Sequence, residues 1–222
     1  MDKGRIEMKY IIWDWNGTLY DDVHICVDSL NSMLKRRGKK PITIQQYREV
    51  FDFPVKQVYP RLGFNMEEED WHKMAREYHD EYLARIHQCG LRNGMYELLR
   101  KLKTLAVPMS LVSACEISIL SNLIRKTSVD EFFADVVGLS DLFANSKKGI
   151  ASDLISKIKT KVPLSSILFV GDTLHDYEIA SESGCQCVLI AGGHQTEKRL
   201  RSAKCPVINE IAELEEFLNG GI

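Results

Sequence analysis

The chain has 222 residues and a formal net charge of −2, with 29 Lys and Arg against 31 Asp and Glu. This balance gives no basic surface for nucleic acid or for acidic lipid, so we expect neither partner. No apolar run approaches the roughly 20 residues that cross a membrane, and the polar first residues are not typical of a signal peptide. The six cysteines form no CxxC pair. We therefore expect a cytoplasmic protein with reduced thiols.

The first chemically informative segment is an apolar run that ends in a carboxylate. We predict a strand over Lys9–Trp13, followed at once by Asp14, Asn16 and Gly17. A carboxylate at the carboxyl end of a buried strand is well placed for a binding or catalytic site. The Asn-Gly pair between apolar residues is also a strong hairpin signature. On its own, this segment is compatible with catalysis and with an ordinary turn.

Residues 21–89 show helical periodicity and no convincing strand. Asp21 and Asp22 are suitable capping residues for a first helix, and a second long helix is expected over Glu67–His87. The aromatic face of that second helix either packs internally or meets a partner. Because the chain leaves the first strand just before this module and returns to the sheet after it, we expect the module to form a lid over the strand ends.

From residue 94 onward, short apolar runs alternate with helical patterns. This alternation is typical of βαβ units, and unbroken apolar runs are typical of strands covered on both faces. We therefore predict an α/β fold with a doubly wound parallel sheet. Besides the first strand, the expected strands are Pro108–Val112, Asp135–Leu139, Ile167–Val170, Gln186–Ile190 and Pro206–Ile208, and the expected helices include Met95–Lys103, Ile150–Ile158 and Glu210–Leu218.

Two segments between the strands carry groups that suit a phosphate. Ser113 ends a predicted strand, and its hydroxyl either caps a helix that begins near Cys115 or joins the backbone N–H groups there in an anion site. Lys147 and Lys148 precede another helix, where an ammonium group can reach the same anion. We favour Lys148, because it directly precedes Gly149, with Lys147 as the second candidate.

The last motif runs from Gly171 through Asp172 to Asp176, at the end of a predicted strand. One aspartate is explained by a helix cap, but not two aspartates together with the distant Asp14. Three carboxylates at two strand ends predict a divalent-cation site, and oxygen ligands favour Mg²⁺ over zinc. We expect His175 to lie on the surface at a helix start and His194 to be a loop residue without a role.

The order of these motifs resembles the haloacid dehalogenase (HAD) superfamily, and its phosphoglycolate-phosphatase-like branch in particular. The resemblance covers nearly the whole chain and implies a Rossmann-like core over residues 1–20 and 90–222, with a helical cap over residues 21–89. It also implies that Asp14 is the nucleophile, which becomes an aspartyl-phosphate. The residues that would hold the transferring phosphate are Thr18, Ser113, Ala114 and the lysine, here Lys148.

The resemblance further implies a Mg²⁺ site in which Asp172 is a direct ligand and Asp176 supports it. Asp14 and the backbone carbonyl of Asn16 would complete the protein ligands. The side chain at position 16 is usually an aspartate that acts as general acid and base, whereas Asn16 has no titratable proton. General acid–base catalysis typically contributes roughly 10²–10⁴-fold. Three compensations remain open: an acidic leaving group, a proton from His175, His24 or water, and substrate assistance.

The leading hypothesis is a Mg²⁺-dependent phosphohydrolase of a small phosphorylated metabolite, acting as a monomer or weak homodimer. Its main rival is a phosphate-binding or regulatory protein in which Asn16 has removed efficient catalysis. Phosphonate cleavage, with Lys56 as the imine-forming candidate, and phosphosugar mutation, which needs the missing acid, fit less well. Substrate choice would be set by the cap, where Phe51–Pro54 either contacts the substrate or forms ordinary cap core.

Overall fold

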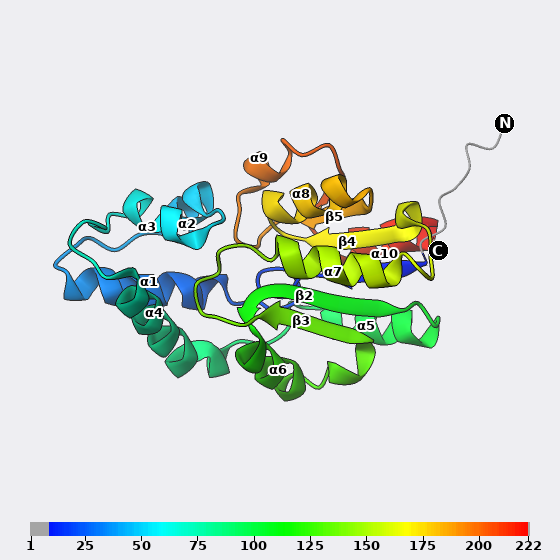
Figure 1. Ribbon diagram of the computed structural model, residues 1–222, viewed down its shortest axis with the longest axis horizontal. Helices are drawn as coiled ribbons and strands as arrows, with labels where there is room; N and C mark the ends of the chain where they lie inside the picture. The colour runs from blue at the N-terminus through cyan, green and yellow to red at the C-terminus, as the bar shows by residue number, and fades with distance from the viewer. Residues whose placement is uncertain (1–8, 222) are drawn as a thin grey trace.

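The computed structural model describes residues 9–221, which form a parallel sheet between two layers of helices and a separate helical group at one end (Figure 1). The six strands lie in the order β3-β2-β1-β4-β5-β6, and every neighbouring pair is parallel. This arrangement confirms the predicted doubly wound α/β fold. The strands are β1 Tyr10–Trp13, β2 Met109–Glu116, β3 Asp135–Leu139, β4 Ile167–Gly171, β5 Gln186–Ile190 and β6 Val207–Ile208.

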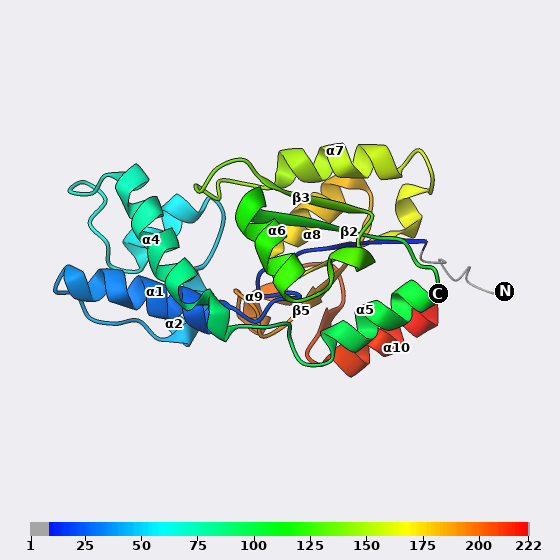
Figure 2. The ribbon, with the colours of Figure 1, turned by 90° about the horizontal axis from the view of Figure 1, so that it is seen from below.

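The helices of the core follow the strands in alternation, as the sequence predicts. Apolar side chains of consecutive residues in β1 point to opposite faces of the sheet, so that Ile11 and Ile12 belong to different buried clusters. The cluster of Ile11 includes residues of α5, α6 and α10, whereas that of Ile12 includes residues of α7 and α8 (Figure 2). The core helices are α5 Met95–Thr104, α6 Ile117–Lys126, α7 Lys148–Ile158, α8 Leu174–Ser183, α9 Glu197–Leu200 and α10 Ile211–Gly221.

The helices between Val23 and Gln88 lie beyond one end of the sheet (Figure 1), and we call them the cap. The long predicted cap helix begins at Trp71 rather than Glu67, because Asp70 accepts hydrogen bonds from the backbone N–H groups of His72 and Lys73. Two short cap helices were not predicted from the sequence. The cap helices are α1 Val23–Arg36, α2 Ile44–Val50, α3 Val58–Arg61 and α4 Trp71–Arg85.

Ion pairs join the two long cap helices along one side. Arg37 at the end of α1 bonds Glu77 of α4 at 2.8 Å and also pairs with Glu69, while Arg36 bonds Glu77 and Glu81. The aromatic face of α4 packs inward, since Tyr82 is buried and Tyr78 stacks on it with 5.9 Å between ring centroids. Within residues 9–221, no helix has the length and apolar character needed to cross a membrane.

The strand order places two motif-bearing strands side by side. The order reverses between β1 and β4, which is the position where open α/β sheets bind their ligands beyond the carboxyl ends of the strands. Trp13 pairs in register with Val170, and the backbone N–H of Asp14 donates to the carbonyl of Val170 at 2.9 Å. The segments that follow Trp13 and Gly171 therefore emerge together beneath the cap.

Candidate active site

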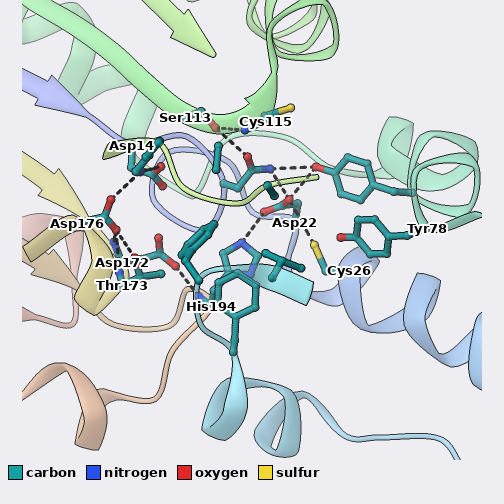
Figure 3. Close-up of a pocket in the computed structure, with 18 of the residues that line it drawn as sticks. Asp14, Asp22, Cys26, Tyr78, Ser113, Cys115, Asp172, Thr173, Asp176 and His194 are labelled. Carbon is teal, nitrogen blue, oxygen red and sulfur yellow. Dashed lines mark hydrogen bonds and ion pairs between the residues drawn. The ribbon is translucent and has the colours of Figure 1, made fainter. Parts of the chain in front are cut away.

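A cavity of about 120 Å³ lies between the strand ends and the cap (Figure 3). Core residues form one end of this cavity, and residues from α1, α2, α4 and the loop after α2 form the other. The residues that line the cavity include Asp14, Asn16, Asp22, Cys26, Tyr47, Phe51, Phe53, Val55, Tyr78, His79, Tyr82, Ser113, Ala114, Lys147, Asp172, Asp176 and His194.

Asp14 lies immediately after β1 and is 5% exposed. Its Oδ1 pairs with the ammonium group of Lys147, which is itself only 2% exposed. Burial raises the pKa of Asp14, and the carboxylates of Asp176 and Asp172 add to the effect, while Lys147 opposes it. A buried carboxylate with one cation and two neighbouring anions is poised to bind a metal ion, because a metal ion would relieve this excess of negative charge.

Lys147, rather than Lys148, supplies the ammonium group of the site, which corrects the sequence-based preference. Helix α7 begins at Lys148, two residues earlier than expected, and Lys147 occupies the position just before it. From there its Nζ reaches Asp14 and also lies 2.6 Å from Oδ1 of Asp176. Lys148 is exposed and pairs with Glu182 of α8 on the surface.

Asp172 and Asp176 are fixed by the strand-to-helix turn after β4. Asp176 is the third residue of α8 and forms a capping box with Thr173, so that its Oδ2 accepts from the hydroxyl of Thr173 at 2.6 Å. Asp172 accepts from the hydroxyl of Thr18 at 3.1 Å and from the backbone N–H of His194 at 2.5 Å. Both carboxylates are buried, and their backbone anchors leave little rotational freedom.

Two glycines allow Asp172 to sit this close to neighbouring loops. A Cβ atom on Gly193 would lie 2.1 Å from Oδ2 of Asp172, and one on Gly17 would lie 2.4 Å from the same atom. Gly17 also has a φ of +74°, a conformation that other residues adopt only with strain. Both positions therefore exclude side chains, and the loops close tightly around this carboxylate.

The residues fit a Mg²⁺ ion. One oxygen from each of Asp14, Asp172 and Asp176 lies within 4.8 Å of the others, and all three side chains are buried. Oδ1 of Asp176 accepts no hydrogen bond among the described residues, although it faces the Lys147 ammonium. An all-oxygen donor set is the kind that Mg²⁺ prefers. The predicted ligands thus converge, with Asn16 beside them.

The side chain of Asn16 is held by three neighbours on the cap side of Asp14. Its Nδ2 donates to Asp22 at 2.7 Å and to the hydroxyl of Tyr82 at 3.1 Å. Its Oδ1 accepts from the hydroxyl of Ser113 at 3.2 Å. Because the amide is neutral, this side chain has no titratable proton to transfer.

Asp22 has a different role from the helix cap that the sequence predicts. It occupies the N-cap position of α1, but its side chain makes no capping hydrogen bond and instead enters the cavity (Figure 3). Besides the Asn16 amide, it accepts from the hydroxyl of Tyr82 at 2.7 Å and from the backbone N–H of Gly17 at 3.1 Å. Burial alone would raise the pKa of Asp22, but the nearby His194 ring and hydrogen bonds from Tyr82 and Asn16 lower it below the ordinary value.

His194 is a member of the site, contrary to the expectation of a loop residue without a role. It is 5% exposed, and its Nδ1 lies 2.8 Å from the hydroxyl of Tyr47 in the cap. Its Nε2 faces Oδ1 of Asp22 at 3.6 Å, too long for a hydrogen bond but close enough for an ion pair. Burial would lower the pKa of His194, but Asp22 and Asp172 raise it.

The remaining predicted phosphate-binding residues divide into two groups. Ser113 and Ala114 line the cavity. Ser113 does not cap the following helix, because β2 continues to Glu116 and the Glu116 carboxylate caps α6 instead. Thr18 is fully buried and lies outside the cavity lining, and its hydroxyl is committed to Asp172.

Three candidates lie outside the cavity lining. His175 is buried rather than on the surface, with Nε2 bonded to Ser146 at 3.0 Å and its ring against Phe53. His24 and Lys56 are exposed. None of the three faces the carboxylates through the cavity, so the structure gives them no direct part in proton transfer or imine formation.

Comparison with known proteins agrees with this geometry. The family model "Haloacid dehalogenase-like hydrolase" matches residues 11–190. The chain belongs to the haloacid dehalogenase-like hydrolase family. Among its relatives, a phosphoglycolate phosphatase of Vibrio parahaemolyticus is 25% identical over 96% of both chains, and one of Pseudomonas fluorescens is 24% identical over 86% of this chain and 72% of its own.

Solved structures show the same fold. A haloacid dehalogenase-like hydrolase from Streptococcus pneumoniae superposes with a TM-score of 0.80 at 18% identity, covering 95% of this chain and 98% of its own. Membership of this family, together with the buried catalytic set and the phosphatase relatives, makes the chain an enzyme of the HAD phosphatase type.

Proposed function

We propose that this enzyme is a Mg²⁺-dependent phosphohydrolase that acts on a small phosphorylated metabolite through an aspartyl-phosphate on Asp14. The observation that carries the proposal is the convergence of Asp14, Asp172, Asp176 and Lys147 at the buried end of one cavity. The phosphoglycolate phosphatase relatives support the same class of reaction. We further propose a monomer or weak homodimer in the cytoplasm, without a nucleic-acid or membrane partner.

In this proposal the metal ligands are Asp14, Asp172 and the backbone carbonyl of Asn16, with Asp176 as support. When bound, Mg²⁺ would supply the positive charge that offsets repulsion between a carboxylate and a phosphoryl group. Lys147 adds a second positive charge at the same point, and it is held there by its ion pairs with Asp14 and Asp176. The Ser113 hydroxyl and the backbone at Ala114 line the place where the phosphoryl oxygens would lie.

The reaction begins with attack of an Asp14 carboxylate oxygen on phosphorus. The bond from phosphorus to the leaving-group oxygen breaks, and that oxygen keeps the electron pair. Water then attacks the aspartyl-phosphate, releases inorganic phosphate and restores the carboxylate. The cap residues around the cavity exclude other water during the first step.

This chain lacks the usual general acid that protonates the leaving group. Asn16 supplies no proton, and neither His175 nor His24 lines the cavity. Of the three compensations, this leaves an acidic leaving group, a proton from water, and substrate assistance; His194, which lines the cavity, is a further proton source. We expect slow turnover of ordinary alkyl phosphates, whose leaving alkoxides need protonation.

The test is release of inorganic phosphate from a panel of phosphomonoesters, with Mg²⁺ and with a chelator. Activity that needs Mg²⁺ and disappears in Asp14→Asn supports the proposal. Asp21→Asn is the matched control, because Asp21 is an exposed neighbour that does not line the cavity. Activity that survives in Asp14→Asn would overturn the aspartyl-phosphate mechanism.

One second function has a specific observation in its favour. The neutral, fully engaged amide of Asn16 also suits a phosphate-binding or regulatory protein with little turnover. In that case Mg²⁺ and inorganic phosphate would bind together, and every phosphomonoester would remain intact. Phosphonate cleavage through Lys56 loses support, because Lys56 is exposed and lies outside the cavity lining.

A further inference from the structure

The two ends of the cavity differ in chemistry. The end at the strands carries the catalytic carboxylates and Lys147, whereas the cap end is largely aromatic and aliphatic. The cap-side residues that line it are Tyr47, Phe51, Phe53, Val55, Tyr78, His79 and Tyr82, together with Cys26. A phosphoryl group at the catalytic end would therefore direct its leaving group against these rings (Figure 3).

A substrate carboxylate would find no free cation at the cap end. Among the described residues that line the cavity, Lys147 is the only lysine or arginine, and it is already paired with Asp14 and Asp176. His79 is kept neutral, because burial lowers its pKa, and its Nδ1 bonds the carbonyl of Ala75 at 2.7 Å. His194 faces Asp22, which offsets any charge on its ring.

Two arginines beside the cap end form hydrogen bonds between cap and core. Arg48 donates through Nε to the carbonyl of Gly193 at 2.7 Å, and Arg199 donates to the carbonyl of Phe51 at 2.5 Å and to Asp52 at 3.0 Å. Neither arginine lines the cavity. Their charges therefore hold the lid and do not face the substrate.

Asp22 adds no positive charge beside the cap end. Its carboxylate is fully buried beside Asn16, between the catalytic end and the tyrosines of α4. It faces the His194 ring, so the pair offers no net positive charge to a substrate anion. Carboxylated leaving groups such as glycolate therefore lack a cation at the cap end.

We propose that the substrate of this enzyme is a phosphomonoester with a small, uncharged aromatic leaving group, that is, an aryl phosphate, and not phosphoglycolate. This inference rests on the proposed function, because it assumes that phosphoryl transfer occurs at Asp14. The cavity volume of about 120 Å³ sets the size. This volume includes the catalytic end, and an apolar cavity of about 150 Å³ holds one benzene molecule, so the leaving group is limited to at most one ring.

An aryl leaving group also reduces the need for a general acid at position 16. A phenol has a pKa near 10, as for the tyrosine side chain, far below that of an aliphatic alcohol. Asp14 attacks phosphorus, the bond to the aryl oxygen breaks, and the phenolate leaves with the electron pair and takes a proton from water. Hydrolysis of the aspartyl-phosphate by a second water then returns Asp14 and yields inorganic phosphate.

Binding of non-hydrolysable phosphonates tests the inference without turnover. Benzylphosphonate, 4-methylbenzylphosphonate and 4-(phosphonomethyl)benzoate share one skeleton, and the methyl compound controls for the size of the added group. With Mg²⁺ present, calorimetry is expected to show the two uncharged compounds binding at least about tenfold more tightly than the carboxylate. Equal or tighter binding of the carboxylate would overturn the inference.

A substitution in the cap tests whether the missing cation causes the preference against the carboxylated phosphonate. Val55 is half-buried in the cavity wall and is not part of the catalytic set. Val55→Lys places a cation at the cap end, so it is expected to reduce the preference against the carboxylated phosphonate by about tenfold or more. Val55→Met introduces a side chain similar in shape to lysine but without its charge, so it is expected to leave the preference unchanged. A loss of preference in Val55→Met would contradict the electrostatic explanation.

Turnover separates failure of the inference from failure of the proposed function. Acetyl phosphate serves as a small phosphoryl donor that makes few demands on the cap end. Asp14-dependent release from acetyl phosphate and phenyl phosphate, with kcat/KM for phosphoglycolate at least about tenfold lower, supports both claims. Efficient hydrolysis of phosphoglycolate would refute the inference alone. No Asp14-dependent release from any compound would refute the proposed function, while the phosphonate series would still decide which ligands the cavity accepts.

Discussion

The amide nitrogen of Asn16 lies 2.7 Å from a carboxylate oxygen of Asp22, and both side chains line the cavity above Asp14. An acid is therefore present one hydrogen bond away from the position at which the family resemblance leads one to expect it. Any charge placed at position 16 would shift the pKa of Asp22, so a substitution there changes the protonation of both positions.

Asn16→Asp alone is expected to damage the site rather than repair it. Two carboxylates at hydrogen-bond distance cannot both ionise, so one pKa rises strongly. The lost donor also leaves Asp22 less satisfied, and the free energy of unfolding at pH 8 should fall by about 1–3 kcal/mol. Chemical denaturation at pH 6 and pH 8 checks this, because the loss should be larger at the higher pH. A variant as stable as wild type at pH 8 would contradict it.

The double variant Asn16→Asp/Asp22→Asn exchanges the two groups and keeps one amide beside one carboxylate. Its free energy of unfolding should lie nearer to wild type than that of Asn16→Asp. If only the acid is missing, turnover of alkyl phosphates should rise by roughly 10²-fold, the lower end of what general acid–base catalysis contributes. Asp22→Asn alone is the control, and an equal gain there would show that the position of the acid is irrelevant.

Lys147→Met and Lys148→Met form a matched pair. Removing Lys147 leaves Asp14 and Asp176 without their buried cation, so we expect turnover to fall at least about 10²-fold and Mg²⁺-free protein to lose about 3 kcal/mol of stability. Lys148 pairs with Glu182 on the surface, so its removal should change stability by less than about 1 kcal/mol. Phosphate release and denaturant unfolding measure both effects. Equal losses in the two variants would contradict the assignment.

Acid should weaken the cap through Glu77. Hydrogen bonds from Arg37 lower the pKa of Glu77 below its ordinary value of 4.5, with Arg36 contributing, despite partial burial. The ionised form is therefore preferred in the folded state, and the stabilisation is present above about pH 4.5 and lost as the pH falls through the lowered value. Glu77→Gln should cost about 1 kcal/mol at pH 7 and less at pH 3.5. Glu67→Gln, an exposed glutamate before α4, should cost almost nothing at either pH.

Stabilisation by Mg²⁺ should increase with pH. Burial and the nearby Asp176 and Asp172 raise the pKa of Asp14 in the metal-free protein, so a proton competes with the metal ion at moderately acidic pH. The rise in Tm on adding Mg²⁺ should therefore be larger at pH 8 than at pH 6. Asp14→Asn removes this titration, and its smaller Mg²⁺ effect should depend less on pH. A shift that is independent of pH in wild type would argue against Asp14 as a ligand.

The sequence predicted the sheet and the catalytic end well because both depend on local patterns. Unbroken apolar runs located the strands to within a few residues, and the carboxylates of Asp14 and Asp172 follow directly from the ends of two of them. Parallel pairing then brings those ends together without further information. The short cap helices α2 and α3 were missed because segments of seven and four residues carry too little periodicity.

The cap side of the site could not be predicted, because its contacts are distant in sequence. Asp22 matches a helix N-cap locally, and nothing nearby indicates that its partner Tyr82 lies 60 residues away. No sequence pattern marks His194 as a site residue, because its contacts with Tyr47 and Asp172 are formed only in the folded structure. The choice between Lys147 and Lys148 depended on a two-residue difference between the predicted and the observed start of α7, which periodicity does not resolve.

One residue, His194, contacts both the cap and the proposed metal site. Its ring contacts Tyr47 of the cap, while its backbone N–H holds Oδ2 of Asp172. Movement of the cap away from the core would break the Tyr47 contact and disturb the same loop that positions this carboxylate. Closure of the cap and the position of Asp172 are therefore coupled through the one loop that contains His194.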